Sequence, residues 1–309
     1  MKTAFLFPGQ GAQYPGMAID LWESSAAVKK LFDIAHKTTG IDVHHLLSQG
    51  SEAELKETVN TQVSVTLANL ASATVLKERE IQADAVAGFS LGEFAALAWA
   101  GVIPVEVVFP LVQKRGVFMA AAAAELDRSA GEPGMAAVLG LSPAQVDEVL
   151  KKAQIPELFG ANYNSPTQVV VSGTAQALKL AAEAFKNAGA KRVITLKVSG
   201  PFHSPLLKKA GEKLAAELDM TVFADPQLVF YSNVTGNRIQ TAAEAKKLAV
   251  RQVTSPVLWT VEEESLARDG FDRVIEVGPG AVLAGLWQAL FPDKTCLPAG
   301  KLTQIAEIC

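Results

Sequence analysis

The sequence predicts an α/β protein whose mostly parallel sheet is covered by helices and whose chain carries an inserted smaller domain. Three observations support this prediction. Short apolar strand candidates alternate with helical segments in residues 1–127 and 199–309. Hydrophobic residues make up 49% of the chain and charged residues only 19%, as expected where a parallel sheet is buried. Residues 128–198 follow a different order, βαββαβ.

The larger part is expected to be discontinuous in sequence, from 1–127 and 199–309. Its strand candidates are short apolar runs, namely Thr3–Phe7, Ala85–Phe89, Leu228–Tyr231 and Arg273–Val277. Its longest helices are expected at Thr61–Glu80 and Pro104–Glu125. Because strands and helices alternate, the sheet is predicted to be parallel and covered on both faces.

The smaller part, 128–198, begins within the linker-like run Asp127–Gly134. Ser142 and Pro143 suit the N-cap and first position of a helix that reaches Lys152, and a second, amphipathic helix is expected over Ala175–Asn187. The strand candidates are Met135–Leu141, Gly160–Asn164, Gln168–Ser172 and Arg192–Val198. This order is that of a ferredoxin-like domain, which we expect as an insertion.

Charge and cysteine content narrow the possible classes of protein. The net charge of −4 gives no basic footprint for nucleic acid. Cys296 and Cys309 both lie near the C-terminus and form no disulfide framework, which favours a reducing compartment. The opening apolar run is too short for a secretory leader, and no uncharged apolar run approaches 18 residues. We therefore expect a cytoplasmic protein without a membrane span.

Ser90 is the candidate nucleophile. It is the centre of a Gly-x-Ser-x-Gly motif between an apolar strand and the helix-forming run Phe94–Ala100. A sharp strand-to-helix turn of this kind presents the serine hydroxyl at the head of the sheet, and the N–H of Leu91 would face a developing oxyanion. The three fixed residues alone occur by chance in about one chain of this length in ten. Glu93 is interpreted as a first-turn carboxylate that complements the helix dipole.

His203 is the candidate base, because a serine needs one to become nucleophilic at neutral pH. The other histidines, His36, His44 and His45, lie in polar loop-like or helix-surface surroundings. His203 follows a strand and lies within a turn, where functional loops of α/β proteins are found. The alternative is a structural histidine that caps the helix near Pro205. No acid nearby in sequence is evident, so a polar side chain or a backbone carbonyl could orient the imidazole.

Arg115 is a candidate ligand for a carboxylate. It falls on the apolar stripe of its helix, which comprises Val108, Leu111, Val112, Phe118 and Met119. A buried guanidinium needs a partner, and its planar fork suits a carboxylate. The periodicity is equally compatible with a substrate carboxylate, an internal ion pair, or a side chain whose head reaches water.

Taken together, these motifs resemble those of the malonyl-CoA:acyl carrier protein transacylase family over nearly the whole chain. The matching segments are Phe7–Gln13, Gly88–Glu93, Gln113–Gly116, Asn164–Pro166, Gly200–Ser204, Asn233–Thr235, Gln252–Val257 and Glu276–Gly280. The resemblance implies an α/β-hydrolase-like large domain with an inserted ferredoxin-like domain.

The resemblance also implies residue roles. Ser90 would be the nucleophile, His203 the base and Gln252 the residue that orients the base. The backbone N–H groups of Gln10 and Leu91 would form the oxyanion hole. Arg115 would bind the malonyl carboxylate, with Asn164 near the active-site cleft.

Two phenylalanines bear on selectivity. Phe202 resembles the residue of malonyl-selective relatives, and its ring would restrict room for an α-methyl branch. Phe89 departs from the family, in which histidine most often precedes the serine. Since Ser90, His203 and Arg115 are all present, we expect an altered rate or acyl preference rather than loss of activity.

The implied reaction is ping-pong transfer of malonyl from malonyl-CoA to the phosphopantetheine thiol of acyl carrier protein, for fatty-acid or polyketide synthesis. No metal or bound cofactor is expected, and a monomer could be complete. The alternatives are a transacylase subunit of a malonate decarboxylase, a serine thioesterase or hydrolase, and a carrier-binding module weakened by Phe89.

Overall fold

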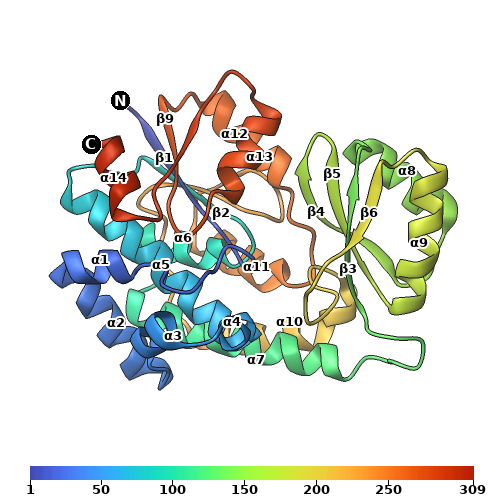
Figure 1. Cartoon of the computed structure of the whole chain (residues 1–309), viewed down its shortest axis with the longest axis horizontal. Coiled ribbons are helices and arrows are strands. Elements are labelled where there is room, and N and C mark those ends of the chain that lie inside the picture. Colours follow the sequence, from blue (N-terminus) through green and yellow to red (C-terminus); the bar gives the residue numbers. More distant parts are fainter.

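The computed structural model describes residues 1–309, which form two sheets with their covering helices (Figure 1). The larger sheet has the strand order β10-β9-β1-β2-β7-β8, and only the β7–β8 pair is antiparallel. Its strands are β1 (Thr3–Phe7), β2 (Ala85–Gly88), β7 (Val229–Tyr231), β8 (Arg238–Ile239), β9 (Arg273–Glu276) and β10 (Cys296–Pro298). The predicted mostly parallel sheet is confirmed.

The smaller sheet is antiparallel, with the order β4-β5-β3-β6. Its elements are β3 (Gly134–Leu139), α8 (Pro143–Ala153), β4 (Leu158–Ser165), β5 (Gln168–Gly173), α9 (Ala175–Asn187) and β6 (Arg192–Thr195). Ser142 caps α8 in a capping box with Gln145, as the Ser-Pro start indicated. The predicted βαββαβ order is confirmed, while the domain limits at 127/128 and 198/199 stay a prediction.

Helices cover the larger sheet on both faces, and the chain ends lie on the same side of the molecule (Figure 1). These helices are α1 (Ile19–Ser24), α2 (Ala26–Thr39), α3 (Val43–Gln49), α4 (Glu52–Lys56), α5 (Thr58–Glu78), α6 (Gly92–Trp99), α7 (Val105–Ala124), α10 (Lys208–Met220), α11 (Ala242–Gln252), α12 (Trp259–Asp269), α13 (Val282–Leu290) and α14 (Leu302–Ile308), with a 3₁₀ turn at Pro205–Leu207.

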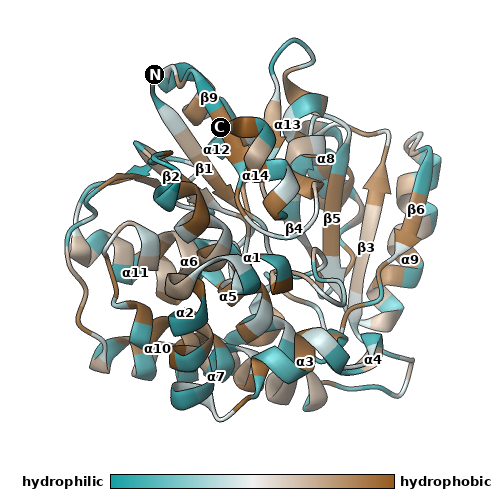
Figure 2. Ribbon diagram, turned by 60° about the vertical axis from the view of Figure 1, so that its left-hand side comes forward, coloured by the Kyte–Doolittle hydropathy of each residue, from teal (hydrophilic) through white to brown (hydrophobic).

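Two helices, α5 and α6, lie at the centre of the core. Both are buried nearly all round, and they pack on each other beside the sheet. A helix without a polar face is stable only when it is enclosed in this way. Figure 2 shows the matching distribution, with hydrophobic colour on α6 and on strands such as β5 and hydrophilic colour on outer helices such as α2.

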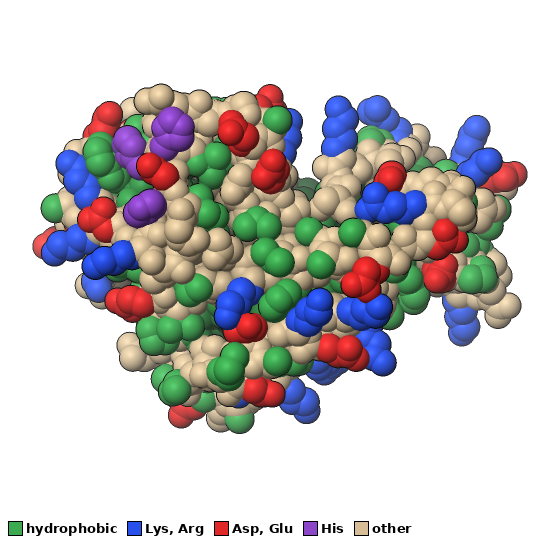
Figure 3. Space-filling model, turned by 90° about the horizontal axis from the view of Figure 1, so that it is seen from below, with side chains coloured by type: hydrophobic (Ala, Val, Ile, Leu, Met, Phe, Trp, Pro, Cys, Tyr) green, Lys and Arg blue, Asp and Glu red, His purple; other side chains and the backbone are tan.

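Helix α7 is the one helix that is long and apolar enough to cross a membrane by length and composition, but half of its most apolar window is buried inside the protein. It packs against α5, α10 and α2, so its apolar character is that of a core helix. The face of the molecule below α7 carries charged side chains of both signs (Figure 3).

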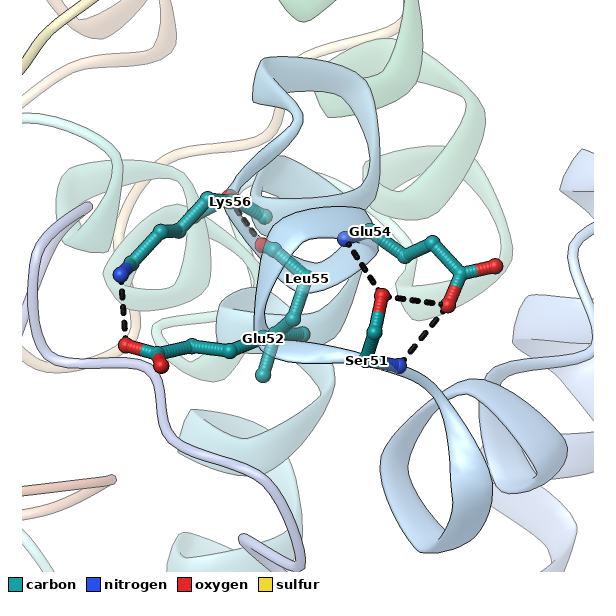
Figure 4. A network of polar contacts seen from close by, with 6 residues as sticks. Ser51, Glu52, Glu54, Leu55 and Lys56 are labelled. Carbon is teal, nitrogen blue, oxygen red and sulfur yellow. Dashed lines mark hydrogen bonds and ion pairs between the residues drawn. The ribbon is translucent and has the colours of Figure 1, made fainter.

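Helix α5 begins at Thr58, three residues before the predicted start, because α4 ends just upstream. In α4, Ser51 and Glu54 form a capping box, and Lys56 pairs with Glu52 at 2.5 Å (Figure 4). Glu57 then leaves the helical conformation (φ −58°, ψ 130°), which separates the two helices.

Candidate active site

Ser90 occupies a sharp turn between β2 and α6, as the motif predicted. Its φ of 51° is left-handed, which is uncommon for a residue with a side chain. A Cβ on Gly88 would lie 2.2 Å from the backbone of Gly92, and a Cβ on Gly92 would lie 2.0 Å from the carbonyl oxygen of Phe7. Both glycines are therefore required sterically, because the strand, the turn and the helix approach one another without room for a side chain.

His203 lies against the serine, with its Nε2 2.7 Å from Ser90 Oγ. Its Nδ1 lies 3.0 Å from the carbonyl oxygen of Gln252 and 3.2 Å from that of Ser255. Two carbonyl oxygens require an N–H at Nδ1, so Nε2 is free to accept the serine proton. The interpretation of His203 as a helix cap is wrong, because its side chain makes these contacts instead.

The environment of His203 keeps it neutral. The side chain is only 4% exposed, and burial, together with the charge of Arg115, lowers the pKa of His203 to about 4. The other histidines lie on α2 and α3 and reach the surface, where Figure 3 shows them in purple. Among the four histidines, only His203 makes a hydrogen bond with Ser90.

The group that orients His203 differs in detail from the expectation for Gln252. The contact comes from the backbone carbonyl of Gln252 and not from its side chain. A second carbonyl, of Ser255, was not foreseen. These carbonyls lie at the carboxyl end of α11 and just beyond it, where the last carbonyls of a helix have no partner in the next helical turn. The Gln252 carbonyl also accepts from the N–H of Ser255 at 3.3 Å.

Arg115 is 1% exposed and directs its guanidinium at the serine. Nη2 lies 3.4 Å from Ser90 Oγ and donates to Gln252 Oε1 at 3.1 Å, while Nη1 donates to Gln62 Oε1 at 2.7 Å. The guanidinium also lies over the ring of Phe94, 5.3 Å from its centroid. Its Nε has no hydrogen-bond partner.

These contacts decide between the alternatives for Arg115. No carboxylate pairs with it, so the internal ion pair is wrong. Its head is enclosed, so a guanidinium that reaches bulk water is wrong as well. Burial lowers the pKa of Arg115 to about 10, so it stays charged at neutral pH. A buried cation that contacts only neutral partners suits an incoming carboxylate.

The side chain of Gln252 connects three parts of the site. Its Oε1 accepts from Arg115, and its Nε2 donates to the carbonyl oxygen of Ser90 at 2.7 Å and to Glu93 Oε2 at 3.1 Å. The Ser90 carbonyl and the Leu91 N–H belong to one planar peptide unit. Gln252 therefore also fixes the direction of the Leu91 N–H.

The backbone N–H groups of Gln10 and Leu91 donate to no acceptor within the protein. The turn at Ser90, from Gly88 to Gly92, is called the elbow below. The loop that contains Gln10 lies directly against the elbow, because a Cβ on Gly9 would be 2.4 Å from the carbonyl oxygen of Phe89. Two free N–H groups beside the serine are the arrangement that an oxyanion hole requires.

A cavity of about 220 Å³ opens at Ser90 and His203. Arg115 lines it, and its other walls come from strands of the smaller sheet, from α7 and α13 and from connecting loops, including Gln10, Met119, Met135, Asn162, Asn164, Val170, Leu196, Val282 and Leu286. Asn164 Oδ1 is buried and has no partner. The structure thus brings together all the side chains proposed from the sequence to face the acyl group.

Phe202 and Phe89 both line this cavity. The ring of Phe202 is 6% exposed and precedes His203. The ring of Phe89 packs edge-on against Trp259, with centroids 5.4 Å apart. It therefore presents an apolar wall beside Ser90, as expected for phenylalanine at this position.

Several buried polar residues behind the elbow were missed. Glu93 was interpreted as a dipole partner, yet it is 2% exposed and accepts from Gln252 and from the backbone N–H of Asn233. Burial raises the pKa of Glu93 to about 7. No local sequence pattern identifies Gln62, Asn233 or Glu262 as functional. Only their position in a longer motif or in an apolar helix could have indicated a role.

The comparisons with known proteins agree with this geometry. The model of the acyl transferase domain family matches residues 4–302. A malonyl CoA-acyl carrier protein transacylase of Bacillus subtilis is 40% identical over 289 residues, which cover 92% of this chain and 89% of the relative.

Two solved structures are similar over their full length. The acyl carrier protein S-malonyltransferase of Vibrio cholerae superposes with a TM-score of 0.95 at 34% identity and covers all of both chains. A malonyl-transacylase in complex with its type II polyketide acyl-carrier protein superposes with a TM-score of 0.93 at 34% identity, covering 99% of this chain and 98% of that one.

Proposed function

The chain belongs to the malonyl CoA-acyl carrier protein transacylase family of acyl transferases, and we propose that it moves a malonyl group from malonyl-CoA to acyl carrier protein through an ester on Ser90. The observation that carries the proposal is Arg115, a buried cation 3.4 Å from Ser90 Oγ that lacks a carboxylate partner. A malonyl group would supply that carboxylate at one end and the reacting thioester carbon at the other.

The first half-reaction forms the ester. His203 Nε2 takes the proton from Ser90 Oγ as the oxygen attacks the thioester carbon. The oxyanion accepts hydrogen bonds from the N–H groups of Gln10 and Leu91. The carbon–sulfur bond then breaks, and His203 returns the proton to the departing thiolate of coenzyme A.

The second half-reaction transfers the acyl group. His203 takes the proton of the phosphopantetheine thiol, and the thiolate attacks the malonyl-serine ester. When the carbon–oxygen bond breaks, the proton returns to Ser90 Oγ. The order of events is ping-pong, because coenzyme A leaves after the malonyl-serine ester forms and before the carrier thiol attacks it.

Selectivity follows from the walls of the cavity. Asn164 has an unpaired buried Oδ1 that can accept from an amide N–H of the pantetheine arm. The ring of Phe202 leaves little room for an α-methyl branch. Phe89 offers neither a donor nor an acceptor, so we propose a changed rate or acyl preference relative to family members with histidine there.

The remaining expectations concern the setting of the enzyme. We propose that it acts in the cytoplasm as a monomer, in fatty-acid or polyketide synthesis, without a bound cofactor or metal. The two unpaired cysteines, Cys296 and Cys309, are compatible with a reducing compartment.

The test is intact-mass analysis of the enzyme after malonyl-CoA and again after phosphopantetheinylated carrier protein. One malonyl adduct should form and then move to the carrier, and Ser90→Ala should form none. An adduct retained by Ser90→Ala would contradict the proposal. Free malonate in place of malonyl-carrier would indicate a hydrolase, and no adduct on the wild-type enzyme would indicate a carrier-binding module.

A further inference from the structure

Asn233 and Glu262 have no place in the proposed chemistry, although both are fully buried directly behind the elbow. Asn233 lies two residues beyond β7, which pairs in parallel with β2. Since parallel strands end at the same edge of a sheet, Asn233 arrives beside the turn that follows β2. It belongs to the Asn-Val-Thr motif, Asn233–Thr235, which has no role in the proposed reaction.

The side-chain amide of Asn233 binds the elbow on both sides of Phe89. Its Oδ1 accepts from the N–H of Ser90 at 2.7 Å, and its Nδ2 donates to the carbonyl oxygen of Gly88 at 2.7 Å. The same Nδ2 donates to Glu262 Oε2 at 2.9 Å. Because the oxygen of the amide must accept and its nitrogen must donate, only one orientation of the side chain satisfies these contacts.

Ser90 needs such support because its left-handed backbone (φ 51°) is strained for a residue with a side chain. A strained conformation persists only where its surroundings fix it. Gln252 holds the carbonyl of Ser90, on the side toward Leu91. The only other hydrogen bond to the backbone of Ser90 outside its own turn is the one from its N–H to Asn233.

We infer that Asn233 is a positioning residue for the Ser90 nucleophile, and that Glu262 fixes the orientation of Asn233. The inference rests on the proposed acyl transfer by Ser90. Neither residue lines the cavity, so neither contacts the acyl group or coenzyme A. Both act through the elbow, by keeping Ser90 Oγ within reach of His203 Nε2 and the Leu91 N–H directed at the oxyanion.

The carboxyl group of Glu262 suits this supporting position. Burial, followed by the nearby charge of Glu93, raises the pKa of Glu262 well above its usual range. This shift favours the neutral carboxyl group, which limits the negative charge behind the oxyanion hole. Its Oε2 still accepts the Asn233 hydrogen bond.

The variants Asn233→Ala, Asn233→Asp and Glu262→Ala test the inference. Asn233→Asp keeps an acceptor for the Ser90 N–H but places an oxygen against the carbonyl of Gly88. Glu263→Ala is the matched control, because Glu263 is equally buried on the same helix and contacts Trp259 Nε1 rather than the elbow. Malonyl adducts are counted by intact mass, and kcat is expressed per enzyme molecule able to form the adduct.

A positioning role lowers kcat per competent site by about 10- to 100-fold in both Asn233 variants, with less loss in Glu262→Ala. KM for malonyl-CoA stays near its wild-type value, because Arg115 and the cavity walls are unchanged. Hydrogen exchange of the peptide that contains Ser90 should also accelerate. Glu263→Ala should lose stability but keep its kcat per competent site.

Two results would overturn the inference. One is an Asn233 variant with fewer competent sites but wild-type kcat at each, which is the signature of a merely structural residue. The other is an equal loss of kcat in Glu262→Ala and Glu263→Ala. If the wild-type enzyme itself forms no malonyl adduct, the proposed function fails instead, so the two failures are distinguishable. Should Asn233→Ala not fold, Asn233→Asp and Glu262→Ala give the same readouts.

Discussion

At the scale of single residues, Arg115 is a cation that the fold buries beside Ser90, the proposed nucleophile, before any substrate arrives. Its hydrogen-bond partners Gln62 and Gln252 are neutral amides, and the nearby carboxyl group of Glu93 favours its charged form without forming an ion pair with it. An acetyl group in the cavity would leave this charge unpaired, at a cost of about 1–3 kcal/mol. A malonyl group would not.

Replacing Arg115 by alanine should therefore change which acyl group is accepted. Malonyl loading of Ser90 should fall by about 10- to 100-fold, while acetyl loading falls less or rises. The measurement is the rate of adduct formation from malonyl-CoA and acetyl-CoA. Lys114→Ala is the control, because Lys114 is the next residue but pairs with Glu217 at the surface. An unchanged ratio of the two rates in Arg115→Ala would exclude the carboxylate role.

The neutral state of His203 has a consequence for pH dependence. Its lowered pKa of about 4 means that the imidazole is already a base throughout the neutral range. Reaction of Ser90 with a neutral fluorophosphonate probe should therefore fall only as the pH drops below about 5, rather than near the ordinary histidine value of about 6.5. The probe lacks a carboxylate, so its own titration does not interfere. A midpoint at or above pH 6.5 would show that the imidazole is not shielded in this way.

At the scale of elements, the elbow depends on the close approach of β1, β2 and α6. Gly92→Ala should destabilise the protein by about 2–3 kcal/mol or more, because its new Cβ would lie 2.0 Å from the Phe7 carbonyl oxygen. Gly285→Ala, in α13, is the control, since a Cβ there meets nothing within 4 Å. That change should stabilise by about 0.5–1 kcal/mol. Thermal unfolding of both variants is the check, and similar shifts in Tm would contradict it.

Elements with a strong local pattern were predictable from the sequence. Thr3–Phe7 and Ala175–Asn187 have the observed bounds, because a proline follows the first and Thr174 caps the second. Strands β8 and β10 were missed because two or three residues carry no measurable periodicity. The predicted strand Ala85–Phe89 ends one residue early, since Phe89 already belongs to the turn.

The residues of the site were predictable only where a recognisable sequence pattern includes them. Ser90 and His203 lie in short, recognisable segments, and Arg115 interrupts an apolar stripe. The polar partners behind them come from α5, α11 and the loop after β7, and their proximity is created by tertiary packing. A single sequence cannot reveal that Glu93, on a helix start, faces inward toward Asn233.

At the scale of the whole molecule, several carboxyl groups are buried and form no ion pair. Burial raises the pKa of Glu93 to about 7 and that of Glu263 to about 9. A group whose pKa is higher in the folded state binds more protons there, so stability falls as the pH rises from about 4.5 through the folded pKa.

The protein should therefore lose stability between pH 4.5 and about 7 through Glu93 and between pH 4.5 and about 9 through Glu263, by up to about 1.4 kcal/mol per pH unit for each group. Glu263→Gln removes one titrating group and keeps an acceptor for Trp259. Its unfolding midpoint should decline less steeply over this range than that of the wild type. Parallel curves would mean that Glu263 is ionised in the folded protein.

The position of Gln252 limits how this enzyme can diversify. Gln252 supplies a carbonyl to His203, an acceptor to Arg115 and a donor to the peptide of Ser90, the three residues proposed to act as base, carboxylate ligand and nucleophile. A mutation at Arg115 that favours another acyl group also frees Gln252 Oε1, and so disturbs the geometry on which turnover depends. New acyl preferences should therefore arise through paired substitutions, with strong epistasis between positions 115 and 252, and rarely through single steps.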